Sequence, residues 1–331
     1  MKIITGDGVS ATITVRMKQS PEGHLTVEIQ YCKVKTDTIR TKSNNFSGKM
    51  LGILIKVLKN FFMKKICPAL QPMINNKLKD LSTMRIHEGR QLDLDFSLSK
   101  DIAVTSSSFD ISFKGLMSVN GQAVDTDSIR PGKEPVFTET SQMIYVGFSE
   151  FFFNVAAMAI YKSGPFVLDT DILHRQLAEW MPKRLWDSLF NVVGIASGPF
   201  KVALTKAPDV HISKDGLSAT VDIEVKSDGQ QSLRMTCRDN MNVEFKERHL
   251  IPVFQNPKCE DTIGTIKKKI QTGVVLNTYI YIINKLFVKE IPIPLPAELS
   301  IIDAKTQFEE GYLVVGGSLT FNPQSSSNAG G

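Results

Sequence analysis

The chain has 331 residues, of which 42% are hydrophobic and 22% are charged. This length allows two domains with buried cores, and this composition excludes a globally disordered chain. The 39 basic and 34 acidic residues leave a formal net charge of +5. That surplus is too small to indicate nucleic-acid binding, but it is compatible with attraction to anionic lipid surfaces.

The chain contains four widely spaced cysteines, Cys32, Cys67, Cys237 and Cys259, and none of them forms a CxxC pair. With only five histidines present, a zinc site built on cysteines is not predicted. An even number of cysteines permits two disulfides if the protein is secreted. In that case Asn45, which begins the single N-x-S/T sequence, is a candidate glycosylation site.

The first ten residues, MKIITGDGVS, contain neither the apolar core of a signal peptide nor a cleavage site of small residues. They therefore predict either a cytosolic protein or a chain whose natural beginning is missing. No clear run of 18 uncharged apolar residues follows, so an integral membrane protein is not predicted.

Alternation of apolar and polar residues predicts a β-hairpin near the N-terminus, with strands at residues 10–18 and 24–32 and a turn at 21–23. One face of this hairpin is expected to be buried, and it carries Ala11, Ile13, Val15, Met17, Leu25, Val27, Ile29 and Tyr31.

The period then changes, and residues 47–81 predict an amphipathic helix with a wide apolar stripe. Lys49, Lys56 and Lys59 lie opposite that stripe. Two interpretations are open: a helix packed on a sheet, or a helix lying on a membrane surface. Pro68 and Pro72 are expected to interrupt or bend it.

The rest of the chain repeats this order of elements. Strand-like alternation returns at residues 92–98 and 108–119, and a linker rich in proline and glycine follows at 126–137. A second unit then contains a strand and helix at 143–161, several short strands, a helix at about 263–288, an extended proline run at 291–296 and a final strand at 311–321. This order suggests a duplicated architecture.

The segment MIYVGFSEFFFNVAAMAIY, residues 143–161, has the length of a membrane span but contains Glu150 and Asn154. Its beginning is typical of a strand, and Ser149 is a suitable N-cap with Glu150 in the first helical turn. The helix is apolar nearly all round, so it must be buried on more than one side, either as core or as the wall of an apolar pocket. At most two of its three consecutive phenylalanines can face the same pocket.

Motifs of common enzymes are absent from the sequence, including GxSxG, HExxH and the Walker loop. The segment GDGVSA at residues 6–11 fits a relaxed dinucleotide pattern, but a strand begins where a helix would have to open. No catalytic site, metal or cofactor is therefore predicted.

Four separated motifs occur together in one order: KICPAL at 65–70, MIYVGFSEFFFNVA at 143–156, IPIPLPAELSI at 291–301 and GYLVVGGSLTF at 311–321. Together they resemble the family of lipid-transfer and lipopolysaccharide-binding proteins. That family includes bactericidal/permeability-increasing protein and the phospholipid and cholesteryl ester transfer proteins. The second and third motifs look most similar to phospholipid transfer protein.

The resemblance implies an α+β boomerang in which a central sheet joins two antiparallel β-barrels with long apolar helices. It divides the chain into an N-terminal barrel at 1–128, a linker at 129–140, a C-terminal barrel at 141–322 and a disordered tail at 323–331. The family begins with further elements that this chain lacks, so the N-terminal barrel is expected to be incomplete. The family disulfide implies a Cys32–Cys67 pair, which leaves Cys237 for Cys259.

The implied function is to hold phospholipid in one apolar pocket per barrel, outside the cell and against membrane or lipoprotein surfaces. The alternative is an innate-immune protein that binds lipopolysaccharide. Nucleic acid is not an expected partner. We expect the N-terminal pocket to include Leu51, Leu54, Ile55, Leu58, Phe61 and Phe62, and the C-terminal pocket to include Phe151, Phe152, Val155, Met158, Val275, Tyr279 and Ile283.

Overall fold

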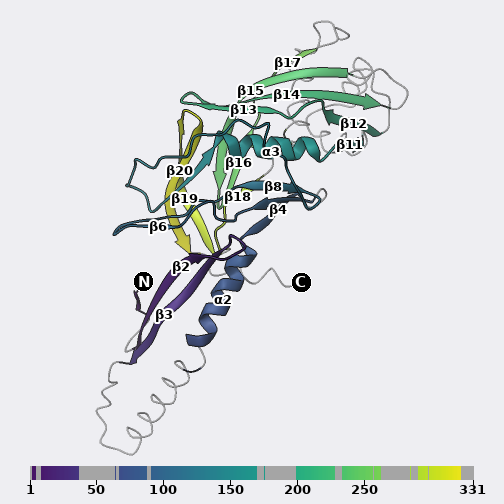
Figure 1. Ribbon diagram of the computed structural model, residues 1–331. Coiled ribbons are helices and arrows are strands. Elements are labelled where there is room, and N and C mark those ends of the chain that lie inside the picture. Colours follow the sequence, from purple (N-terminus) through teal and green to yellow (C-terminus); the bar gives the residue numbers. More distant parts are fainter. Residues whose placement is uncertain are drawn as a thin grey trace, which may run out of the picture. The chain divides into compact units, whose positions relative to one another are not determined.

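The computed structural model describes residues 2–4, 9–36, 64, 67–87, 91–169, 175, 199–227, 233–255, 257–261, 284, 290–296 and 298–321, and the following statements concern these residues (Figure 1). The chain divides into two compact units. The first contains Met1–Met84 and Asp95–Gly115, and the second contains Arg85–Leu94 and Leu116–Gly331. The boundaries at 128 and 140 stay a prediction.

The first unit contains the predicted hairpin. Strands β1 (Lys2–Ile4), β2 (Val9–Gln19) and β3 (Leu25–Thr36) form an antiparallel sheet in that order. Gly23 closes the turn with a φ of 89°, a left-handed conformation that favours glycine, and its N–H donates to Ser20 O. Helix α2 (Cys67–Asp80) lies along the outer edge of β3 and contains Pro72.

A β-bulge changes which side chains share a face of this hairpin. Val15 pairs with Ile29, but Thr14 pairs with Tyr31 and Ile13 with Cys32, so β3 carries one extra residue at this point. Val15 on the apolar face is 37% exposed, so this face is not buried as predicted. Tyr31 leaves the face altogether and is 47% exposed, and its predicted place there is wrong. Cys32 takes that place instead.

The segment 92–119 forms shorter strands than its alternation predicted. Strands β4 (Thr83–His87), β5 (Leu92–Asp95), β8 (Leu116–Val119) and β9 (Gln122–Ala123) form one sheet in that order. Strands β6 (Ala103–Val104) and β7 (Phe109–Asp110) form a separate two-stranded sheet. Between β7 and β8, Phe113 makes only an isolated bridge to Leu98, and Gly115 has a φ of 60°.

The second unit contains an eight-stranded antiparallel sheet. Its main path runs β11 (Phe166–Asp169), β12 (Pro199–Leu204), β14 (Gly216–Ser227), β15 (Leu233–Lys246), β16 (His249–Val253) and β18 (Ile291–Pro292). Strand β13 (Asp209–Ser213) pairs with β14, and β17 (Lys258–Asp261) pairs with β15. Alternate residues of β12, β14 and β15 are buried, including Phe200, Val225 and Met235, so one face of this sheet is core.

A second, three-stranded sheet in this unit has the order β10 (Ile144–Ser149), β20 (Tyr312–Phe321), β19 (Leu299–Glu309). The strand expected at 311–321 is confirmed as β20. Strand β19 was missed because a register shift between Ile302 and Lys305, with Asp303 at a φ of 53°, breaks its alternation.

Helix α3 (Glu150–Lys162) follows β10 directly and contacts β8, β10 and β13. The predicted N-cap is confirmed: Ser149 has an extended backbone, and its Oγ accepts a hydrogen bond from Phe152 N at 3.2 Å. The helix predicted at 47–81 is confirmed in its second half as α2, and its residues before 67 lie outside the described ones, apart from Lys64. The helix predicted at about 263–288 also lies outside them, apart from Asn284.

The linker, at residues 132–137, packs against strand β10 and the first residues of helix α3. A Cβ atom added at Gly147 would overlap Pro135 Cβ, and one added at Gly132 would lie 2.9 Å from Phe151 N. The Phe137 ring lies 6.3 Å from that of Tyr145. Glycine is required at these two positions because neighbouring atoms occupy the space of a side chain.

We predict that Gly147→Ala lowers the free energy of unfolding by about 1–3 kcal/mol, because the added methyl group overlaps the Pro135 ring. Chemical denaturation measures this change. The same substitution in a Pro135→Gly background should be less destabilising, since that change removes the opposing atoms. An equal loss in both backgrounds would show that the linker does not pack here.

Candidate functional site

Helix α3 is the described element that carries predicted C-terminal pocket residues, and its polar side chains Glu150 and Asn154 both bind a neighbouring strand. Glu150 and Asn154 are four residues apart and therefore lie on one side of the helix. That side faces the free edge of β13, whose other edge pairs with β14. The polar residues that argued against a membrane span are thus used for contact with a sheet.

The contact satisfies the backbone groups along that strand edge. Val210 N donates to Asn154 Oδ1 at 2.9 Å, and Asn154 Nδ2 donates to Val210 O at 2.8 Å. Ile212 N donates to Glu150 Oε2 at 2.9 Å, and Gly311 N donates to Ile212 O at 2.9 Å. Because these groups are partly or fully buried, each would destabilise the fold if it were left unpaired.

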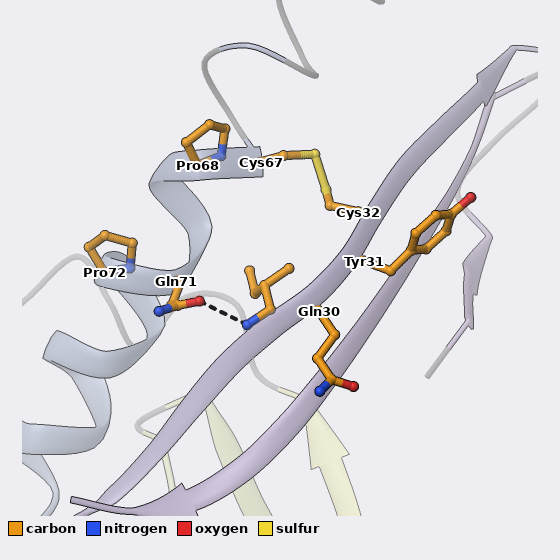
Figure 2. Close-up of a pocket in the computed structure, with 8 residues that line it drawn as sticks. Gln30, Tyr31, Cys32, Cys67, Pro68, Gln71 and Pro72 are labelled. Atoms are coloured by element: carbon orange, nitrogen blue, oxygen red, sulfur yellow. Dashed lines mark hydrogen bonds between the residues drawn. A yellow bond between two sulfur atoms is a disulfide. The ribbon is translucent and has the colours of Figure 1, made fainter.

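The first unit has the same arrangement between α2 and β3. Val27 N donates to Asn75 Oδ1 at 2.7 Å, and Asn75 Nδ2 donates to Val27 O at 3.0 Å. Ile29 N donates to Gln71 Oε1 at 2.8 Å, and Figure 2 draws this hydrogen bond as a dashed line that ends at the labelled Gln71. In both units the helix binds the strand through two side chains that are four residues apart. The asparagine binds one strand residue, and the side chain four residues before it accepts a hydrogen bond from the strand residue two positions further along.

The spacing has a geometric cause. Four helical residues advance by about 6 Å, and two strand residues by about 6.8 Å, so a helix that runs antiparallel to a strand matches it at this interval. We call the two-way contact of an asparagine with one strand residue an amide clamp. Asn284 makes the same two-way contact with Phe254, the residue after β16, at 2.9 Å from Phe254 N and 2.8 Å to Phe254 O. The duplicated order of elements therefore has a residue-level counterpart.

The structure contains the two expected disulfides. Cys32–Cys67 joins β3 to the first residue of α2, one helical turn before Gln71, and the bulge directs Cys32 toward the helix (Figure 2). Cys237–Cys259 joins directly opposed residues of β15 and β17, and Cys237 is fully buried. The first bond thus joins a helix to a strand, and the second joins two strands that are already paired.

A pocket of about 360 Å³ lies beside the Cys32–Cys67 disulfide. Four of its residues come from β3 and four from α2, and they are Ile29, Gln30, Tyr31, Cys32, Cys67, Pro68, Gln71 and Pro72. None of the predicted lipid-pocket residues lines it. Its lining mixes amide, phenol and proline side chains, so it differs in character from a pocket for acyl chains.

The described residues of the predicted C-terminal pocket fall into two groups. Phe152 and Val155 are 8% and 0% exposed, and the Phe152 ring packs against Phe148 and Phe153, each with ring centroids 5.5 Å apart. Phe151 and Met158 are half-buried and lie seven residues apart, on one stripe of α3. This second stripe is the better candidate for a ligand-facing surface.

The other predicted pocket residues lie outside the described part of the chain. They are Leu51, Leu54, Ile55, Leu58, Phe61, Phe62, Val275, Tyr279 and Ile283. The candidate glycosylation site at Asn45 also lies outside it. Their predicted roles stay predictions.

The described residues contain no group of three or more His, Cys, Asp or Glu side chains that could hold a metal ion. Burial raises the pKa of Asp222, but hydrogen bonds from Lys206 and Thr236 outweigh burial and leave that pKa below its ordinary value. Asp222 lies on β14 and is not part of α3. Among the helices that the structure describes, none is long and apolar enough to cross a membrane.

By fold, the chain is similar to a crystal structure of lipopolysaccharide binding protein, with a TM-score of 0.51 and 16% sequence identity. That match covers 95% of this chain and 75% of the other. In its described residues, the structure is thus that of a sheet-dominated α/β protein with few helices.

The family models are more specific. The N-terminal domain model of the LBP / BPI / CETP family matches residues 3–84, and the C-terminal domain model matches residues 87–177. Human phospholipid transfer protein is 20% identical over 96% of this chain and 70% of its own length, and the mouse protein is 21% identical with the same coverage. Bovine lipopolysaccharide-binding protein is 18% identical over 95% of this chain and 72% of its own. The chain belongs to the LBP / BPI / CETP family, a family of lipid-binding and lipid-transfer proteins.

We predict that Asn154→Ala lowers the free energy of unfolding by about 1–3 kcal/mol, because Val210 loses both partners of its backbone groups. The Val210 amide should also exchange its hydrogen faster, which NMR can follow. Asn240→Ala is the matched control, since Asn240 is exposed on β15 and should change stability by less than about 0.5 kcal/mol. Equal stability of the two variants, with Val210 still protected, would contradict the role of the clamp.

Proposed function

We propose that this protein binds phospholipid in apolar pockets and transfers it between lipid surfaces, without catalysing a reaction. The observation that carries the proposal is the match to phospholipid transfer proteins over 96% of this chain. The match includes both family domains in consecutive order, so it is not confined to one motif.

The physical demand on such a carrier is an apolar environment for acyl chains. Each methylene group that leaves a bilayer for water costs about 0.8 kcal/mol, so a two-chain lipid needs a long apolar lining. Helix α3 is suited to provide part of one, because the edge of β13 binds its polar side chains Glu150 and Asn154. The stripe of Phe151 and Met158 contains no charged group.

The proposed architecture has two β-barrels joined by a central sheet, with one pocket in each barrel. The sheet β10–β20–β19 is the candidate central sheet in the described part of the second unit. The N-terminal pocket is proposed at Leu51 to Phe62 and the C-terminal pocket around α3 and residues 275–283. Half-burial of Phe151 and Met158 supports the second of these.

Secretion is part of the proposal, and the two disulfides support it, because disulfides form and persist in oxidising compartments. Glycosylation at Asn45 is proposed in the same setting. The proposed partners are phospholipid and the membrane or lipoprotein surfaces that the protein contacts peripherally. Nucleic acid is not among them.

The second candidate function is capture of lipopolysaccharide in innate immunity. The similarity to bovine lipopolysaccharide-binding protein and to rat bactericidal permeability-increasing protein, 21% identical over 93% of this chain, favours it. The two functions differ in ligand rather than in mechanism, because both place acyl chains in an apolar site. Competition of lipopolysaccharide against fluorescent phosphatidylcholine distinguishes them.

We predict that organic extraction of the purified protein releases phospholipid that mass spectrometry identifies. Met158→Trp should reduce uptake of a fluorescent phospholipid several-fold, because the larger ring fills space that acyl chains would occupy. The lipid-free variant should keep its stability, since the ring fills a cavity and does not overpack a core.

Met73→Trp on α2 is the matched control, because Met73 is 56% exposed and lies outside both proposed pockets. Two results would contradict the proposal. One is the absence of extractable lipid and of phospholipid uptake. The other is a Met158→Trp variant that loses stability and takes up lipid normally, which would assign Met158 to ordinary core.

A further inference from the structure

Residues 99–113 form a β-hairpin with a buried base and an exposed tip. At the base, Leu98 is fully buried and bridges Phe113, and Ser99 N donates to Ser112 O at 2.9 Å. Phe96 and Phe113 make an edge-to-face contact with ring centroids 5.7 Å apart. The hairpin is therefore held at its base by contacts within its own unit, while residues 103–110 are exposed.

The tip presents two large apolar side chains to solvent. Val104 and Phe109 are direct partners in the β6–β7 pair, so they lie on the same face of the hairpin. They are 68% and 59% exposed. An isolated apolar side chain at a surface is ordinary, but an adjacent pair at the end of a projecting hairpin is a candidate contact surface.

The turn beyond this pair satisfies several of its own polar groups. Thr105 N donates to Ser108 O at 2.8 Å, and Thr105 Oγ1 accepts from Ser108 N at 2.9 Å and from Ser107 N at 3.3 Å. Backbone groups that already have partners lose little free energy when water is removed from around them. The tip can therefore enter a partly dehydrated layer without unfolding.

The charge of the hairpin indicates what kind of surface it suits. Residues 102–109 contain no charged side chain, and Lys100, Asp101, Asp110 and Lys114 around them sum to zero. A tip of this composition gains nothing from an anionic surface and carries no charge that must be desolvated. The short hydroxyl side chains of Thr105 to Ser108 suit the polar headgroup layer.

We propose that this hairpin is a docking element that inserts Val104 and Phe109 into the interface of a zwitterionic phospholipid surface. The inference deepens the proposed function, because a carrier must contact the surfaces between which it moves lipid. Two side chains give weak and reversible attachment, which suits repeated encounters. Burial of one Val or Phe side chain changes partitioning by about tenfold to hundredfold.

The test is flotation of the purified chain with vesicles of pure phosphatidylcholine. Phe109→Ser and Val104→Ser should each lower the bound fraction at least severalfold, up to the range just given. Phe321→Ser and Val136→Ser are matched controls, since these side chains are 65% and 58% exposed elsewhere in the chain, and both should bind as the unaltered protein does. High salt and added anionic lipid should change binding less than twofold, because no charge drives it.

A reporter variant tests insertion itself. The fluorescence of Phe109→Trp, after subtraction of the signal of Trp180 and Trp186 in the unaltered protein, should be quenched by brominated phosphatidylcholine. That of Phe321→Trp should not be quenched. This readout separates docking from pocket loading, because it uses intact vesicles and does not require lipid to be extracted by the protein.

Several results would overturn the proposal. They are a failure of the unaltered chain to float with the vesicles, equal binding by the Ser variants and the controls, and binding that salt abolishes. A dimer of the unaltered chain that Phe109→Ser dissociates would assign the tip to a second copy instead. If docking is observed but no lipid is taken up, the docking inference stands and the proposed carrier function fails.

Discussion

A strand edge that is covered by an apolar helix loses its water, so its backbone N–H and C=O groups need partners that the helix itself supplies. In this chain one asparagine of α2 and one of α3 each provide both a donor and an acceptor to a single strand residue. Asn75 does so for Val27 and Asn154 for Val210, and Asn284 makes the same two-way contact with Phe254, just beyond the end of β16. The free edges of β3 and β13 are thereby closed without a further strand, which also removes a template for unwanted pairing.

This pairing determines how each helix can be oriented. Because Glu150 and Asn154 must face β13, the rotation of α3 about its axis is set, and the remaining positions are assigned to other neighbours. Phe152 and Phe153 then meet Phe148 from β10, while Phe151 lies beside the glycine of the linker. Glu150 and Asn154 make α3 unsuitable as a membrane span. The same two residues give the helix one polar contact, with β13, beside its apolar contacts.

The sequence allowed the local elements to be predicted where short-range rules dominate. The hairpin of β2 and β3 follows from alternation and from Gly23, and the start of α3 follows from Ser149. It did not reveal the bulge that turns Tyr31 outward and Cys32 inward, because one inserted residue shifts side chains without changing the strand's composition. Nor could it show that Glu150 and Asn154 bind a strand 56 or more residues away, since that depends on tertiary register. The cysteine pairs came from family resemblance rather than from spacing.

The candidate site and the hairpin at residues 99–113 solve the same physical problem in different ways. Lipid can lie against protein only where the polar groups of the backbone are already paired, because acyl chains offer them no hydrogen bonds. Around α3 the pairing is done by side chains of the helix on the neighbouring strand. At the hairpin it is done by Thr105 within the turn itself. In both places polar groups next to the proposed contact are paired inside the protein, beside Phe151 and Met158 in one case and Val104 and Phe109 in the other, which are the side chains proposed to contact lipid.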